Sequence, residues 1–210
     1  MNSFLASDQL FSESSAIKNV SIDDKLLKQF STNVRKLAKT LQDWIELSTD
    51  WDMAIGRLRR ADWQLRNDPT PLNLSHPAII DLSEGIGILE GLFKNMSSDI
   101  QQTCISIIAS GKKILENKTS ELTNMLLNEL NKVDENSRVN IVIVRQESIR
   151  INVSNWLMEK GINHWKVFTA NQFIHSDMHC TRMLVVGLTQ DYPISPVSYT
   201  HLTLPTKRIV

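Results

Sequence analysis

The sequence predicts an α + α/β protein, in which an N-terminal helical region precedes an incomplete parallel sheet of RecA-like or Rossmann-like type. Two observations lead to this class. From about residue 21 to 133, apolar residues recur at alternating spacings of three and four, which indicates helices. From residue 137 to 187, short β-branched runs alternate with an amphipathic segment, which is typical of strands joined by a crossover helix.

The first two expected helices follow an N-terminus, residues 1–20, that lacks a clear pattern and should be weakly ordered. Residues 21–24 have the form of a capping box, residues 49–52 repeat it, and residues 67–69 (Asn-Asp-Pro) should end the second helix. The two helices could be continuous. Their expected apolar stripe is Leu27, Phe30, Val34, Leu37, Leu41, Trp44, Trp51, Ile55, Leu58 and Leu65.

Three more helices are expected before the sheet. They start at Pro77, Ser98 and Glu121, and the last should end near Val133. Three glycines between residues 85 and 91 lie off the apolar stripe of the first, which predicts a close approach of another element or a broken helix. The expected stripes are Ile79, Leu82, Ile86, Leu89 and Phe93; Ile100, Cys104, Ile107, Ile114 and Leu115; and Leu122, Leu126, Leu130 and Val133.

The α/β segment begins after a polar linker at residues 134–137. Residues 138–144 form a short, nearly apolar, β-branched run, as expected for a strand buried on both faces of a parallel sheet. Residues 146–160 form an amphipathic helix that should end at a glycine, and residues 165–168 and 183–187 supply two more strands. The sequence therefore predicts three parallel strands.

The composition is that of an ordinary folded protein. Hydrophobic residues make up 41% of the 210 residues and charged residues 22%, and the formal net charge is zero. This balance does not indicate a polyanionic partner or an acidic membrane surface. No stretch approaches the ~18 apolar residues of a membrane span. Cys104 and Cys180 lack metal or redox spacing, which fits a reducing compartment, so we expect a cytoplasmic protein that does not contact a membrane.

Four arginines in the second expected helix form a candidate nucleic-acid stripe. They are Arg57, Arg59, Arg60 and Arg66, with tryptophans interleaved at positions 51 and 63. Basic and aromatic side chains on one face bind phosphates and stack on bases. A second interpretation is a solvated helix surface, on which Asp62 and Arg66 form an ion pair one helical turn apart.

No catalytic motif is complete. The Ser110-Gly-Lys-Lys113 run lies within a helix and lacks the spacing of a phosphate loop, and the glycines at 85–91 follow no strand. His175 and His179 are four residues apart, as in helical zinc sites, but no further ligand accompanies them and we expect a solvent loop. The sequence thus predicts no catalytic, cofactor-binding or metal-binding residue in this chain.

Residues 116–169 resemble the opening of the second RecA-like domain of Swi/Snf-type and related superfamily-two helicases. The features that carry the resemblance are a polar Glu116-Asn-Lys-Thr119 segment, a leucine-rich helix, the strand at 139–144, the turn Leu157-Met-Glu-Lys-Gly161-Ile162 and the strand Val167-Phe-Thr169. The resemblance implies a nucleic-acid-dependent motor, or a degenerate relative such as a phage-defence protein, whose full-length form uses ATP and Mg²⁺. It transfers no catalytic residue, because that domain has no phosphate-loop lysine and its late Gln/Arg motif would lie beyond this chain.

Two functional hypotheses follow. In the first, the chain is a fragment of a helicase-like ATPase that acts on DNA or RNA. It contributes an accessory helical region and part of the second motor lobe, and it is inactive alone. In the second, the chain is a non-catalytic α/β scaffold whose helical region binds a protein partner. Parallel α/β units serve so many functions that the fold cannot choose between them.

The C-terminal segment, residues 196–210, differs in composition from the strand before it. Val197 to Thr206 resemble a translated sequencing adapter, so we expect a non-native tail that packs on nothing and a natural chain that continues beyond residue 195. The expected organisation is a weakly ordered N-terminus (1–20), a helical region (21–136), a truncated α/β domain (137–195) and this tail.

Overall fold

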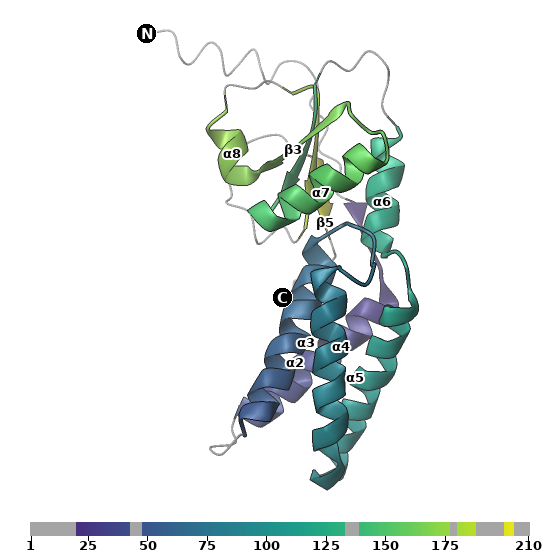
Figure 1. Ribbon diagram of the computed structural model, residues 1–210, viewed down its shortest axis with the longest axis vertical. Helices are drawn as coiled ribbons and strands as arrows, with labels where there is room; N and C mark the ends of the chain where they lie inside the picture. The colour runs from purple at the N-terminus through teal and green to yellow at the C-terminus, as the bar shows by residue number, and fades with distance from the viewer. Residues whose placement is uncertain (1–19, 43–47, 133–138, 177–179, 188–199, 204–210) are drawn as a thin grey trace, which may run out of the picture.

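The computed structural model describes residues 20–42, 48–132, 139–176, 180–187 and 200–203. Its elements are β1 (Val20–Ser21), α2 (Lys25–Gln42), α3 (Thr49–Asn67), α4 (Pro77–Leu92), a 3₁₀ turn (Phe93–Asn95), α5 (Ser98–Glu116), α6 (Glu121–Leu130), β2 (Asn140–Val144), α7 (Glu147–Glu159), β3 (Trp165–Thr169), α8 (Ala170–Ile174), β4 (Arg182–Val186) and β5 (Thr200–Thr203). Figure 1 shows helices α2 to α5 as one part and the sheet with α6, α7 and α8 as a second part above it. The α + α/β class is therefore confirmed.

The first helix starts later than the sequence pattern suggests. Residues 20–21 form strand β1, and α2 begins at Lys25, where the Asp24 carboxylate accepts the Leu27 N–H over 2.8 Å. The expected capping box at residues 21–24 is therefore wrong, since Asp24 and not Ser21 caps the helix. An aspartate is a strong N-cap because its carboxylate accepts the free N–H groups of the first turn and its charge opposes the helix dipole.

Helices α2 to α5 pack around one apolar core, with α3 against α4 and α2 against α5. The stripes expected from the sequence supply this core, while Trp44 lies outside the described residues. The buried members of those stripes are Leu27, Phe30, Val34, Leu37, Leu41, Trp51, Leu58, Leu65, Ile79, Leu82, Ile86, Leu89, Ile100, Cys104, Ile107 and Ile114.

Glycine in α4 marks the close approach of α3, as the sequence predicts. A Cβ atom on Gly85 would lie 3.0 Å from Cδ2 of Leu58 and 3.2 Å from Cβ of Arg57. The helix remains continuous from Pro77 to Leu92. A Cβ on Gly87, in contrast, would meet nothing within 4 Å, so only the first of these two glycines is needed for packing.

The sheet is parallel throughout and has the strand order β1-β5-β4-β2-β3. The three predicted strands are adjacent, and Val142 at the centre of β2 is in register with Val167 of β3 and Leu184 of β4. All five residues of β2 are buried, because helices cover both faces of a parallel sheet.

Helices α6 and α7 cover one face of the sheet, and α8 lies against the other. On the first face, Leu126 of α6 and Trp156 of α7 belong to the same apolar cluster as Val142. On the second face, Phe173 of α8 packs near Ile143. Packing thus assigns α6 to the α/β part, although it precedes the polar linker in the sequence.

The expectation that residues 196–210 contact nothing is wrong for four of them. Thr200–Thr203 form β5, which pairs in parallel with β4 on one side and with β1 on the other. The main chain makes this pairing, and a strand edge offers N–H and C=O groups to any extended segment whatever its side chains. Composition therefore did not reveal it. The rest of 196–210 lies outside the described residues.

Candidate functional site

Two of the four candidate arginines join α3 to α4. Arg57 donates from Nη1 to Oδ1 of Asp81 over 2.8 Å, and its Nη2 lies 2.6 Å from Oε2 of Glu84. Arg60 donates from Nη2 to the same Asp81 oxygen over 3.2 Å. These carboxylates raise the pKa of Arg57, chiefly through the hydrogen bond that Arg57 donates to Asp81. Both arginines therefore have intramolecular anionic partners.

Arg66 is also paired, and it joins α3 to α2. Its Nε donates to Oδ1 of Asp62 over 2.9 Å, and its Nη2 donates to the hydroxyl of Ser31, which in turn donates to Asp62. The predicted ion pair between Asp62 and Arg66 is therefore present. Arg59 is exposed and has no partner among the described residues. These contacts disfavour a continuous cationic stripe, although the Asp62–Arg66 pair is largely buried and does not lie on a solvated helix surface.

The cysteine and histidine residues near β4 do not form a metal centre in the described part of the chain, which contains no group of three potential metal ligands. Residues 177–179, with His179, lie outside that part. Burial raises the pKa of the Cys104 thiol to about 11 and raises that of Cys180. Both thiols are therefore protonated at neutral pH, which makes them weak nucleophiles and weak ligands.

The carboxyl ends of parallel strands are the usual place for a ligand in such a sheet. Here the residues at those ends make structural contacts. Arg145 after β2 lies over the ring of Trp63, 5.5 Å from its centroid. Thr169 at the end of β3 forms a capping box with Gln172, and Gln172 also donates to Glu147 over 2.9 Å. This edge is thus used to attach α3 and to start α7 and α8.

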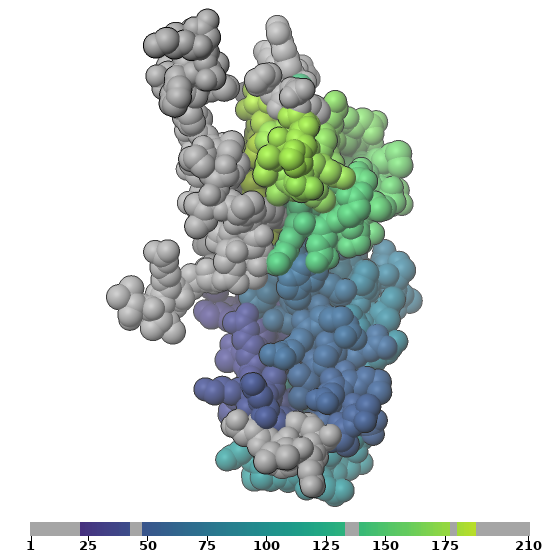
Figure 2. Space-filling view, turned by 90° about the vertical axis from the view of Figure 1, so that its left-hand side faces the viewer, coloured from purple at the N-terminus to yellow at the C-terminus, as the bar shows by residue number. Residues whose placement is uncertain are grey.

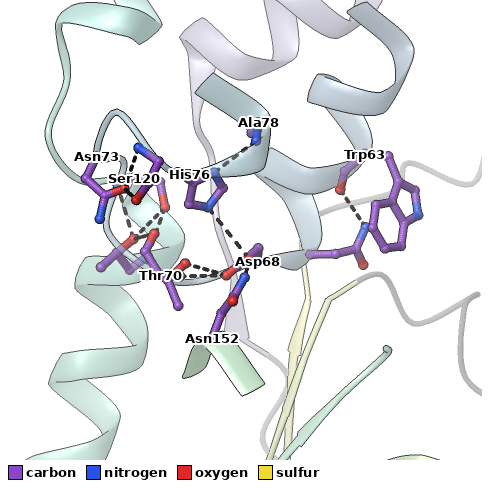
Figure 3. Close-up of polar contacts among 11 residues, drawn as sticks. Trp63, Asp68, Thr70, Asn73, His76, Ala78, Ser120 and Asn152 are labelled. Atoms are coloured by element: carbon purple, nitrogen blue, oxygen red, sulfur yellow. Dashed lines mark hydrogen bonds and ion pairs between the residues drawn. The ribbon is translucent and has the colours of Figure 1, made fainter. Parts of the chain in front are cut away.

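A buried polar cluster lies where the two parts of the molecule meet. It is centred on Asp68, which follows α3 and is 3% exposed. Oδ1 of Asp68 accepts the N–H of Thr70 over 3.0 Å and the Thr70 hydroxyl over 2.7 Å. Oδ2 accepts a hydrogen bond from Nδ2 of Asn152, which lies in α7, over 3.1 Å. Figure 3 shows these groups converging on the carboxylate from both parts of the chain.

His76 completes the cluster at the start of α4. Its Nδ1 accepts the Ala78 N–H over 3.1 Å and caps the helix, while its Nε2 lies 3.8 Å from Oδ2 of Asp68 (Figure 3). Burial lowers the pKa of His76, against an opposing effect of Asp68. The imidazole is therefore neutral at pH 7, and because Nδ1 accepts a hydrogen bond its proton is on Nε2.

A second set of hydrogen bonds ties the same loop to α6. Ser120 and Thr123 form a capping box, in which the Thr123 N–H donates to Oγ of Ser120 over 3.0 Å. The Thr123 hydroxyl then donates to the carbonyl of Thr70 over 3.4 Å. The loop between α3 and α4 is thus held by α6 as well as by α7.

This cluster forms the floor of a cleft of about 370 Å³ between the loop and α7. Amide, hydroxyl and proline groups dominate its lining, and Glu159 is the only carboxylate in it. The lining residues are Thr70, Pro71, Asn73, Ser75, His76, Pro77, Asn152, Asn155, Trp156 and Glu159. Figure 2 shows from the side how the α/β part, in green, sits on the blue end of the helical part.

The chemistry of this cleft is that of polar binding. Both nitrogens of His76 face groups of the protein itself, Nδ1 the Ala78 N–H and Nε2 the Asp68 carboxylate, so the imidazole is not placed as a base for a bound molecule. No lysine or arginine belongs to the lining, which makes the cleft a poor site for phosphates. Amides and hydroxyls, in contrast, suit neutral hydrogen-bonding partners.

From the sequence, the second helix is expected to end at residues 67–69 and the next to start at Pro77, and no functional residue is expected between them. Two local signals were present. Asp68 precedes Thr70 by two residues, a spacing at which a carboxylate bonds its own backbone, and His76 directly precedes a proline at the first position of a helix. Neither signal predicts that Asn152 of α7 would donate a hydrogen bond to Asp68.

Comparison with protein-family models, curated proteins and solved structures finds no match for this chain. In the described part of the chain, no helix combines the length and the apolar character that crossing a membrane requires.

Proposed function

We propose that this chain is a non-catalytic α/β scaffold with a rigidly attached helical region, and that the cleft at their junction binds a segment of a protein partner. The observation that carries the proposal is the lining of the cleft. Asn73, Asn152 and Asn155 present amides beside the Ser75 hydroxyl. An asparagine amide both donates and accepts, as a peptide group does, so these side chains match the main chain of a polypeptide.

The joint between the two parts supports this role. Asp68 receives hydrogen bonds from its own loop and from α7, so hydrogen bonds to one buried carboxylate connect the two walls of the cleft. A site whose walls are fixed before binding loses less conformational entropy when a partner is ordered on it. Pairing of Arg57, Arg60 and Arg66 with carboxylates also favours a protein partner over nucleic acid.

The test is selection of random peptides displayed on phage against the purified chain. Asn155, exposed on α7 and lining the cleft, is changed to Arg to fill it, and Ser148, exposed on α7 outside the lining, is changed to Arg as a charge-matched control. Peptides selected on the original chain should lose binding to Asn155→Arg and keep it with Ser148→Arg. Selected peptides that bind all three proteins equally, or no selection at all, would contradict the proposal.

A second candidate function is part of a lobe in a larger nucleic-acid-acting ATPase. The order α6, β2, α7, β3 in a parallel sheet, with Thr169 ending β3, favours it because the helicase resemblance implies that order. In this case the full-length protein would use ATP and Mg²⁺, and this chain alone would hydrolyse no ATP. Weak DNA binding that falls with added salt, and that Arg59→Ala reduces further, would support this candidate. Absence of binding at low salt would exclude it.

A further inference from the structure

The charge balance of the junction cleft is negative. Glu159 is exposed, lines the cleft and has no partner among the described residues. The carboxylate of Asp68 lies directly behind the lining and receives only uncharged donors from Thr70 and Asn152. His76 stays neutral because burial lowers its pKa. Since no lysine or arginine lines the cleft, its field attracts a cation.

Hydrogen-bonding groups remain available on both walls. Oδ1 of Asn73 accepts the N–H of Ser75 over 3.1 Å and its hydroxyl over 2.8 Å, which leaves the Asn73 NH₂ group as a donor. Nδ2 of Asn152 is used by Asp68, which leaves its Oδ1 as an acceptor. Asn155 has no partner among the described residues. The two walls thus offer donors and acceptors to a main chain.

We infer that the junction cleft selects a basic residue, lysine or arginine, in the partner segment, with the cation at Glu159 and the flanking peptide groups on the asparagine amides. This inference rests on the proposed function. The aliphatic part of a lysine or arginine side chain would pack on Pro71 and Pro77 while its charged end reaches the carboxylate. A phosphate or an acidic segment would instead meet the Glu159 carboxylate, with the charge of Asp68 buried behind the lining.

The experiment uses the full chain and four peptides, acetyl-Gly-Ala-X-Ala-Gly-amide with X as Lys, Arg, norleucine or Glu. Side-chain amide signals of Asn73 and Asn155 are followed by NMR. The Lys and Arg peptides should shift both signals with saturation, and the norleucine peptide should bind several-fold more weakly. Glu159→Gln should weaken the Lys peptide about fivefold, as expected for a partly exposed charge pair. Glu116 is exposed at the end of α5 and lies outside the lining, so Glu116→Gln should leave the affinity for the Lys peptide unchanged.

The outcomes separate the inference from the proposal on which it depends. Equal binding of all four peptides at the cleft, or insensitivity to Glu159→Gln, would overturn the selection of a basic residue and leave a peptide-binding cleft. Binding of the Glu peptide more tightly than the Lys peptide would also overturn the selection of a basic residue. If no peptide shifts Asn73 or Asn155 at millimolar concentration, both the inference and the peptide-binding cleft are wrong. Because Glu159 is exposed, its replacement leaves the fold intact, and unchanged signals from β2 verify this.

Discussion

Asn152 on α7 donates from Nδ2 to Oδ2 of Asp68 over 3.1 Å, a hydrogen bond between residues 84 positions apart in the chain. It is one of the contacts through which the α/β part holds the loop that connects α3 to α4. Because Asp68 is buried and its other oxygen is occupied by Thr70, loss of the carboxylate would leave donors on both parts without an acceptor.

Asp68→Ala is therefore expected to destabilise the chain by about 3 kcal/mol, since several buried donors lose one charged acceptor together. Urea denaturation followed by circular dichroism measures this. Asp23→Ala is the matched control, because Asp23 is exposed and its loss should change the free energy of unfolding by less than about 0.5 kcal/mol. Equal effects of the two changes would show that Asp68 does not hold the junction.

A double-mutant cycle isolates the contact between the two parts. Asn152→Ala alone should cost about 1 kcal/mol, and in the Asp68→Ala background it should cost clearly less, because the acceptor has already gone. Additive effects of the two substitutions would mean that the hydrogen bond contributes nothing to stability. The same urea titrations supply all four free energies.

The glycines of α4 should respond in opposite directions to alanine. Gly87→Ala is expected to stabilise the chain by up to about 1 kcal/mol, because its Cβ meets nothing within 4 Å and alanine is the better helix former. At Gly85 the added Cβ would lie 3.0 Å from buried Leu58, so Gly85→Ala should destabilise by about 1–3 kcal/mol through overpacking. A stabilised Gly85→Ala variant would contradict the close approach of α3 and α4. Thermal unfolding at one protein concentration decides the sign.

Stability should fall as the pH is lowered below about 7. The pKa of His76 is lower in the folded chain than its ordinary value of 6.5, so the unfolded chain binds the proton more readily and acid favours unfolding. His76→Asn retains an N-cap acceptor for the Ala78 N–H and cannot titrate. The variant should therefore lose less stability than the original chain between pH 7 and pH 5.5, the range above the titration of most carboxylates. Parallel stability curves would disprove the role of His76.

The two thiols should differ in accessibility. Cys104 of α5 is fully buried in the apolar core of helices α2 to α5, and burial raises its pKa to about 11, so Ellman's reagent should label it only after unfolding. Cys180 is partly exposed and should react first in the folded chain. Cys180→Ser identifies which thiol reacts. Rapid labelling of that variant under native conditions would show that the helical core opens readily.

The spacing of apolar residues was sufficient to predict helices α2 to α7, the three adjacent strands β2, β3 and β4, and most of the buried side chains, but not strands β1 and β5. The three- and four-residue spacing of Leu27, Phe30 and Val34 predicts one buried helix face. The unbroken β-branched run of β2 predicts a strand that is buried on both sides. The pair of Asp62 and Arg66 was also predictable, because both residues lie on one helix at a separation of four. The beginning of α2 was missed, because the expected capping box at residues 21–24 is absent and Asp24 caps a helix that begins at Lys25.

The amino-acid order thus determined which segments fold as helices and strands and which faces they bury, because these properties depend on residues a few positions apart. Only the tertiary structure decided the candidate site. Asp68, His76 and Asn152 come from the end of α3, the start of α4 and the middle of α7, and each was an ordinary polar residue in its own segment. Burial of the Asp68 carboxylate is tolerated because hydrogen bonds from Thr70 and Asn152 replace those to water, and the bond from Asn152 forms only because the two parts dock.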